Sequence, residues 1–400
     1  MRVTRGKDGL AAAPSLARRA PARPFAAKTC PKLHGTIRDV AWRELDSTSA
    51  IAAWDALAQT ASEPNPFYES WYLLPSLRAL DPGGTVRVLR FEHSGELLGL
   101  LPVRRERRYY GRPIAHIGNW LHPNCFLGTP LVARGMERSF WQALLGWADI
   151  RPGGALFLHL ANLPLGGRLE TTLREVAAGQ HRRAALVHRQ ERAMLCSELA
   201  PAAYWQAALN AKKRKELRRQ HARLSELGTL AVERRDDAAG IAAWIETFLA
   251  LEAAGWKGRA GSALAAHADT AELFRGVLAG AAQRGRLQRL ALTLDGKPIA
   301  MLASLLAPPQ AFAYKTCFDE AYAAFSPGVL LQRENLALLE RGDITQCDSC
   351  AAAGHPMIDH IWRERRAIGR LSVAIGGPLR RGLFGILARV ELARTAMPRD

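Results

Sequence analysis

The chain has 400 residues, 48% of them hydrophobic, and a formal net charge of +18 at pH 7, so it can form two cores of ordinary size and favours anionic partners. Six cysteines are too few for a disulfide framework, and no apolar run approaches the roughly 20 residues that a membrane-spanning helix requires. A disulfide-rich secreted domain and a transmembrane protein are thereby excluded, and we expect a cytoplasmic protein, with a peripheral position at the inner membrane face as an alternative.

Residues 1–35 are rich in Ala, Arg and Pro and carry eight Lys or Arg against one acid, Asp8. An Arg-rich, acid-poor start resembles an organellar transit peptide. The prolines of this stretch oppose the single amphipathic helix of such peptides, so we expect a disordered basic tail.

Residues 36–200 predict a first α/β domain. The alternating strands Thr85–Phe91 and Glu96–Val103 flank Ser94-Gly95, a two-residue hairpin signal. A third strand, an apolar helix and a further strand are expected at Pro113–Gly118, Met136–Ile150 and Ala155–Leu160.

Residues 201–228 predict a basic helix that connects two domains. Ala203–Leu227 carries apolar side chains at helical spacing. The run Lys212–Arg219 together with Arg223 holds seven cations against one acid. Like charges four residues apart repel by a few tenths of a kcal/mol per pair. Two interpretations stay open: a solvated face, or a surface that docks a phosphorylated substrate or nucleic acid through Arg214, Lys215, Arg218 and Arg219.

Residues 229–372 predict a second α/β domain that repeats the first. A helix over Asp236–Ala253 ends at Gly255, and Trp256, Lys257 and Arg259 follow, where they could form the lip of a substrate cleft. Trp256 is also consistent with a packing anchor.

The strands of this second domain repeat the earlier pattern. Arg286–Leu294 and Pro298–Leu306 flank Asp295-Gly296, and a third strand covers Ala311–Phe318. A loop, a helix and the closing strand Ile344–Cys350 follow, so two similar domains are the simplest account.

The helix of the second domain begins at Ser326-Pro327-Gly328. Proline suits the first turn, and Ser326 is a candidate N-cap. Because the N–H groups at a helix start are free to bind phosphate, the donor-binding candidates are Ser326, Pro327, Gly328, Val329, Leu330 and Leu331. The alternative is an ordinary core in which Gly328 only permits close packing.

Cys347, Cys350, His355 and His360 have a spacing similar to that of a zinc knuckle. Positions i and i+3 of a strand point to opposite faces, so we expect no metal there.

Residues 373–400 predict a basic amphipathic tail. Gly376–Met397 places leucines and isoleucines opposite arginines, so the helix either lies on an anionic membrane or packs against the body of the protein.

Taken in order, several of these motifs resemble the BioF2-like acetyltransferase family of the GNAT superfamily, which includes CelD-type proteins. The resemblance covers about residues 40–370 and is more distant to the Fem aminoacyl transferases. The similar positions are Trp205 with the Lys/Arg run, Gly255–Arg259, Asp295–Ala300, Tyr314-Lys315, Phe318-Asp319, Ser326–Gly328, and Asn65-Pro66-Phe67 with Trp71.

The resemblance implies an α/β (α+β) fold of tandem GNAT-like domains, each a mixed, mostly antiparallel sheet flanked by helices. It implies acyl-CoA at Ser326–Leu331, the position of the GNAT pyrophosphate loop, where only Gly328 of the usual Arg/Gln-x-x-Gly-x-Gly/Ala pattern is kept. Fem proteins take aminoacyl-tRNA and carry a lysine after the signature tryptophan, where this chain has Tyr72.

Acyl transfer to an amine requires the neutral amine, and deprotonating an alkyl amine of pKa about 10.4 at pH 7 costs about 4 to 5 kcal/mol. A general base is therefore expected, with Asp348, Tyr314 and Asp319 as the catalytic candidates. Lys315 is a candidate for binding a phosphate or carboxylate group.

Three functions stay open. The first is an N-acyltransferase that moves an acyl group from acyl-CoA to an amine of an anionic small molecule or envelope glycan precursor. The second is a Fem-like enzyme that uses aminoacyl-tRNA. The third is a noncatalytic accessory protein of polysaccharide biosynthesis.

Overall fold

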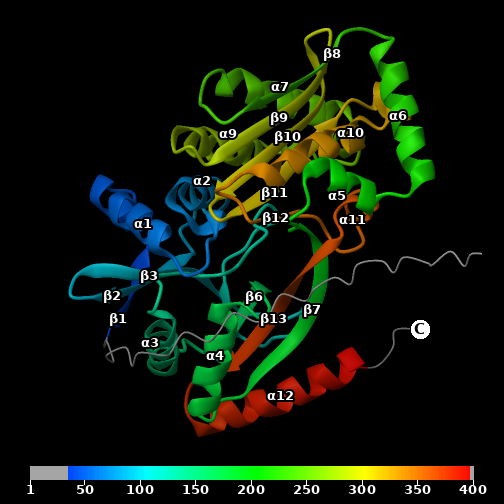
Figure 1. The fold of residues 1–400 in the computed structure, drawn as a ribbon. Helices are drawn as coiled ribbons and strands as arrows, with labels where there is room; N and C mark the ends of the chain where they lie inside the picture. The colour runs from blue at the N-terminus through cyan, green and yellow to red at the C-terminus, as the bar shows by residue number, and fades with distance from the viewer. Residues whose placement is uncertain (1–34, 397–400) are drawn as a thin grey trace, which may run out of the picture. The chain divides into compact units, whose positions relative to one another are not determined.

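One mixed sheet organises residues 35–396, the part of the chain that this computed structural model describes, with side chains described through residue 393. Its strand order is β1-β2-β3-β4-β6-β13-β7-β12-β11-β10-β9-β8, and β5 pairs with β3 beside this path (Figure 1). The predicted basic tail falls outside the described residues apart from Gly35. The strands are β1 (Thr36–Ala41), β2 (Arg87–His93), β3 (Glu96–Glu106), β4 (His116–Asn119), β5 (Leu131–Val132), β6 (Phe157–Pro164), β7 (Ala184–Leu195), β8 (Leu230–Arg235), β9 (Leu287–Leu294), β10 (Lys297–Ala307), β11 (Gln310–Phe318), β12 (Gln346–Asp348) and β13 (Glu364–Ala374).

Helices cover both halves of this sheet (Figure 1). The α-helices are α1 (Thr48–Thr60), α2 (Ser70–Leu80), α3 (Glu137–Ile150), α4 (Arg168–Gly179), α5 (Pro201–Ala208), α6 (Ala211–Ser225), α7 (Ile241–Ala254), α8 (Trp256–Arg259), α9 (Ala268–Gln283), α10 (Pro327–Asn335), α11 (Ile358–Ile361) and α12 (Pro378–Ala396). The 3-10 helices are η1 (Trp42–Leu45), η2 (Pro66–Tyr68), η3 (Leu264–Ala266), η4 (Glu320–Phe325) and η5 (Leu336–Glu340).

The two halves of the sheet repeat one arrangement. β1, β2, β3 and β4 are successively antiparallel and β4 is parallel to β6; β8, β9, β10 and β11 are likewise antiparallel and β11 is parallel to β12. Both hairpins turn through two residues of positive φ, Ser94-Gly95 and Asp295-Gly296. The predicted hairpins and their repetition are confirmed, because these turns depend on local backbone conformation.

The halves are joined within the sheet. β12 pairs antiparallel with β7, and β13, which comes late in the chain, lies between β6 and β7 of the first half. The predicted α/β class with a mixed sheet is confirmed, and the predicted tandem units share one continuous sheet.

The predicted single helix over 203–227 is wrong, because the chain forms α5 and α6 instead. Leu209 is extended, and the side chain of Asn210 accepts a hydrogen bond from the N–H of Lys213 at 2.8 Å. Asparagine at this position satisfies an N–H of the first helical turn and so starts a new helix.

The predicted helix cap at Ser326 is also corrected. Ser326 has a φ of 52° and its side chain makes no capping hydrogen bond, although α10 does begin at Pro327. The preceding 3-10 helix η4 ends on this left-handed residue, and that conformation decides where Ser326 points.

The predicted amphipathic tail forms α12, which lies beside β7 and β13 (Figure 1). Its inner face buries Phe384 and Ala388 against the aromatic cluster around Phe157. Its outer face exposes the large apolar side chains Leu379, Leu383, Ile386 and Val390. Within residues 35–396, no helix combines the length and the hydropathy needed to cross a bilayer.

Candidate functional site

The second half of the sheet opens where β11 and β12 part. The two strands pair in parallel only from Gln310↔Gln346 to Phe312↔Asp348, while β11 continues to Phe318. In the described part of the chain, residues 313–318 therefore have no strand partner on the β12 side. Backbone N–H and C=O groups at such an edge are available to a ligand.

A β-bulge lies in β11 at the beginning of this opening. Ala303 pairs with Lys315 and Ser304 with Ala313, so that Tyr314 is an extra residue without a partner in β10. Bulges change the direction of side chains and are frequent beside active sites. The corresponding pair of the first half, β3 and β4, has no bulge. The bulge is therefore a difference between the two halves, and it lies where the second half of the sheet opens.

Side chains of the first half meet Tyr314 at the bulge. The Tyr314 hydroxyl lies 3.3 Å from that of Tyr72 on α2, and the Tyr72 hydroxyl donates to the carbonyl of Asn124 at 2.5 Å. Tyr314 is 3% exposed, and burial raises its pKa above the ordinary value. Tyr314 is therefore a neutral phenol at pH 7, able to donate a proton.

Lys315 and His122 are the two basic side chains of this cluster. The Lys315 ammonium donates to Asn124 Oδ1 at 2.6 Å, and burial lowers its pKa to about 8. Burial and the neighbouring Lys315 charge lower the pKa of His122 to about 3. The ring nitrogens of His122 are buried and have no hydrogen-bond partner among the described residues. At pH 7 the cluster thus presents a mostly charged amine beside a neutral imidazole.

A second lysine satisfies the open edge of β11. Lys257 of α8 donates to Glu252 Oε1 at 2.7 Å and to the carbonyl of Thr316 at 3.0 Å. Glu252 Oε2 accepts from the N–H of Leu264 at 2.8 Å, so this buried carboxylate fixes the segment that follows α8. Lys257 therefore lies at the predicted lip of the substrate cleft, where its ammonium group is bound to a carboxylate and to a strand carbonyl.

Asp348 ends β12 and is enclosed by two arginines. Its Oδ2 accepts from Arg192 at 2.6 Å and from Arg366 at 2.9 Å, while Oδ1 accepts from the N–H of Cys350 at 2.9 Å. Burial alone would raise its pKa, but the charges of the two arginines hold the pKa of Asp348 below the ordinary value. At 1% exposure, Asp348 is a fixed anion that joins β12 to β7 and β13.

The start of α10 lies against side chains and beside a cavity. A Cβ on Gly328 would meet Met357 Sδ at 3.4 Å and Phe318 at 3.6 Å, so Gly328 itself faces packed atoms. Next to it, Val329 lines a cavity of about 540 Å³ together with Met357, Leu209, Leu217 and Lys213. Pro327, Leu330 and Leu331 are buried, and Ser326 is half-buried.

The basic helix α6 contributes to that cavity and to another. Arg214 and Arg218 line a cavity of about 650 Å³ with Trp205 and Arg333, and Arg214 also donates to carbonyls at the end of α5. Lys215 and Arg219 are exposed and have no ion-pair partner within residues 35–396.

The remaining predicted residues lie around η4. The Asp319 side chain accepts from the N–H of Ala321 at 2.9 Å and starts that helix. Glu320 accepts from the N–H of Trp256 at 2.8 Å and from Arg259 at 2.6 Å. Trp256 is 54% exposed. The predicted residues thus lie in five places: at the β11 edge, at the end of β12, at the start of α10, along α6 and around η4.

The sequence did not point to Tyr72, His122, Asn124 or Glu252 as site residues. Single tyrosines, histidines and amides carry no spacing signal, and three of the four come from the first half of the chain. Tyr72 had been noted only as the residue after the signature tryptophan.

No group of three or more His, Cys, Asp or Glu side chains within the described residues could hold a metal ion. Cys347 and Cys350 are both buried, and burial raises the pKa of each thiol.

Comparison with known proteins finds one family model and solved structures of similar fold. Residues 211–355 match the family model described as "Acetyltransferase (GNAT) domain". The chain is similar to the crystal structure of FemX, with 8% identity, a TM-score of 0.53, and coverage of 84% of this chain and 98% of that one. It is also similar to a conserved protein of unknown function from Bacteroides thetaiotaomicron, with 9% identity, a TM-score of 0.52, and coverage of 81% and 97%. A search of curated proteins gave no match.

These likenesses define a class. At such low identity the two solved structures show the fold alone, and the family match covers residues 211–355, which contain the β11 opening and α10. The fold of this segment is of the GNAT acetyltransferase type.

Proposed function

We propose that the protein is an N-acyltransferase that takes its acyl group from acyl-CoA and passes it to an amine of an anionic acceptor. The observation that carries this proposal is the bulged, unpaired edge of β11 with Tyr314 beside it. A strand edge with free N–H groups can polarise a thioester carbonyl, and such preorganised donors stabilise a tetrahedral intermediate.

In this proposal the acceptor enters as the neutral amine, after its ammonium form has given a proton to water, and its nitrogen attacks the thioester carbonyl carbon. The C–S bond then breaks, the departing thiolate takes the proton of the Tyr314 hydroxyl, and the proton that the nitrogen loses restores that hydroxyl, which Tyr72 orients. The ring nitrogens of His122 have no hydrogen-bond partner among the described residues, so His122 is proposed to contact the incoming amine.

The donor is proposed to lie along Ser326–Leu331. The neighbouring cavity of about 540 Å³ is mainly apolar, with Lys213 and His360 at its wall, which suits an acyl or pantetheine arm better than a polyphosphate. Met357 lies beside Gly328 at the start of α10, and its side chain is flexible enough to move for a donor group.

The acceptor is proposed to be anionic because Lys315 has no carboxylate within hydrogen-bond distance among the described residues. A mostly charged ammonium held by an amide oxygen can still pair with a phosphate or carboxylate of the substrate. Lys257, Arg259, Trp256 and the α6 cations are the further acceptor-binding candidates.

Replacing Val329 by Trp tests the donor site. The larger side chain fills part of the cavity beside α10, so KM for acyl-CoA should rise by about tenfold or more, with a smaller change in kcat. Thiol release from acyl-CoA with a panel of anionic amines is the measurement. Val232→Trp, at an exposed valine of the edge strand β8, is the matched control. No turnover of any acyl-CoA by the wild-type protein would contradict the proposal.

The Fem-like alternative rests on α6, whose Lys215 and Arg219 are exposed and unpaired in the part of the chain that the structure describes. Binding of tRNA that weakens steeply with salt, in the absence of acyl-CoA turnover, would favour it. Absence of both activities would favour the noncatalytic accessory role.

We also propose peripheral contact with an anionic membrane through α12. Leu379, Leu383, Ile386 and Val390 recur at helical spacing on its outer face, at 86%, 59%, 60% and 46% exposure, and Arg389 is exposed beside them. Flotation with vesicles of 30% phosphatidylglycerol should recover the protein, and Leu383→Ser with Ile386→Ser should abolish recovery. Equal recovery of both proteins would contradict this contact, and self-association of the wild type alone would assign the stripe to a second copy.

A further inference from the structure

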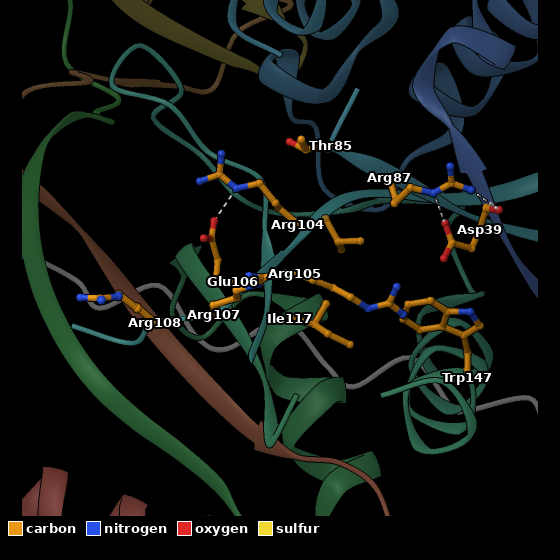
Figure 2. Close-up of a pocket in the computed structure, with 11 residues that line it drawn as sticks. Asp39, Thr85, Arg87, Arg104, Arg105, Glu106, Arg107, Arg108, Ile117 and Trp147 are labelled. Carbon is orange, nitrogen blue, oxygen red and sulfur yellow. Dashed lines mark hydrogen bonds and ion pairs between the residues drawn. The ribbon is translucent and has the colours of Figure 1, made fainter. Parts of the chain in front are cut away.

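A cavity of about 700 Å³ lies in the first half of the sheet, along β2 and β3 (Figure 2). None of the predicted donor, catalytic or acceptor residues lines it. Five arginines line it against two carboxylates, Asp39 and Glu106, which leaves a formal charge of +3; the arginines are Arg87, Arg104, Arg105, Arg107 and Arg108.

Three of these arginines are fixed by the protein itself. Arg87 Nε donates to Asp39 Oδ1 at 2.7 Å, and Arg104 pairs with Glu106. Arg105 donates to the carbonyl of Arg151 at 2.9 Å and lies 5.7 Å from the centre of the Trp147 ring. Figure 2 shows this guanidinium reaching the indole, so the wall of the cavity is already ordered without a ligand.

Arg107 and Arg108 are different. Both are exposed, and within residues 35–396 neither has a hydrogen bond or an ion pair from its guanidinium. The chain is nevertheless held directly after them, because Tyr109 pairs with Arg112 and its hydroxyl donates to Glu391 of α12 at 2.7 Å. The two free guanidiniums therefore project from an anchored segment, which lowers the entropy lost when they bind.

A further unsatisfied donor lies at the same cavity. Trp147 is 7% exposed, and its indole Nε1 is buried without an acceptor among the described atoms. An uncompensated cluster of guanidiniums beside an unpaired N–H favours a ligand that brings acceptor oxygens and negative charge. Arginine suits phosphate in particular, because its planar fork donates two parallel hydrogen bonds to it.

We propose that this cavity is a second binding site, for a ligand that carries at least two phosphate charges. Arg107 and Arg108 hold the phosphates at one end of the cavity, and Arg105 with Trp147 lies at the other end (Figure 2). The volume lies in the range of small-molecule sites. The phosphate belongs either to a soluble phosphorylated compound or to a lipid headgroup, and the site does not depend on acyl transfer elsewhere in the molecule.

The test is calorimetric titration of the full chain with inorganic pyrophosphate and tripolyphosphate at two salt concentrations. The wild type should bind, more weakly at higher salt, and Arg107→Gln with Arg108→Gln should weaken binding by at least about tenfold. The matched control is Arg134→Gln with Lys297→Gln, which removes the same charge from two exposed positions whose side chains have no hydrogen bond or ion pair within residues 35–396. Equal weakening by both pairs, or no binding by the wild type in this and the vesicle arm, would overturn the proposal.

A vesicle arm distinguishes the two sources of phosphate. It uses the chain with Leu383→Ser and Ile386→Ser, so that α12 does not contribute, and vesicles with and without a lipid bearing a phosphomonoester headgroup. Recovery that depends on that lipid and on Arg107 and Arg108 assigns the site to a headgroup. Binding of pyrophosphate alone assigns it to a soluble compound. Thermal unfolding of each variant verifies that it is folded.

Discussion

Tyr314→Phe should lower kcat by about 100-fold or more while leaving KM for acyl-CoA nearly unchanged. The phenol is neutral, since burial raises its pKa, and its oxygen lies 3.3 Å from that of Tyr72 at the open edge of β11. Removal of a general acid costs about 10² to 10⁴ in rate. Thiol release at saturating acyl-CoA is the measurement.

The role of this proton can be separated from a packing role. Thioesters whose departing thiol is more acidic need less help from an acid, so they should be less sensitive to Tyr314→Phe. Tyr204→Phe is the matched control, because Tyr204 is equally buried but its hydroxyl donates to Glu364, at 2.7 Å. A uniform loss across all thioesters, or a loss of the same size in Tyr204→Phe, would remove Tyr314 from the chemistry.

Asp348→Asn should lower the free energy of unfolding by about 3 to 5 kcal/mol, because the change leaves the buried Arg192 and the partly buried Arg366 without their carboxylate. Urea unfolding followed by circular dichroism measures this. Asp46→Asn is the control, since the Asp46–Arg78 pair is exposed on both sides and its loss should cost less than about 1 kcal/mol. A stable Asp348→Asn protein with a large loss of kcat would instead make Asp348 the general base.

The same contribution has a defined dependence on pH. The two arginines lower the pKa of Asp348 in the folded protein below the ordinary value near 3.9. Its contribution to stability is therefore fully present above that value and is lost as the pH falls through the lower, folded pKa. The difference in unfolding free energy between the wild type and Asp348→Asn should shrink accordingly in acid.

Local signals predicted much of the second half. Asp295-Gly296 required positive φ at both residues, and Pro327 marked the first turn of α10, so the hairpin and the helix start followed from neighbouring residues. The prediction of one continuous basic helix is wrong because Asn210 does not lie inside a helix; it caps the start of α6. The exposed edge strand β8 was missed because its residues do not alternate between buried and exposed.

The sequence by itself determined the repeated hairpin pattern, the start of α10 and the excess of positive charge, since each depends on residues that are close along the chain or on composition alone. Only the tertiary structure decided which residues surround Tyr314. Tyr72 and Asn124 lie 242 and 191 residues from their partners Tyr314 and Lys315. It also decided that β13 enters the first half and that Asp348 meets two arginines. Burial determines these pairings, because a polar group that is removed from water needs a hydrogen-bond partner, and tertiary packing decides which distant residue lies close enough to be that partner.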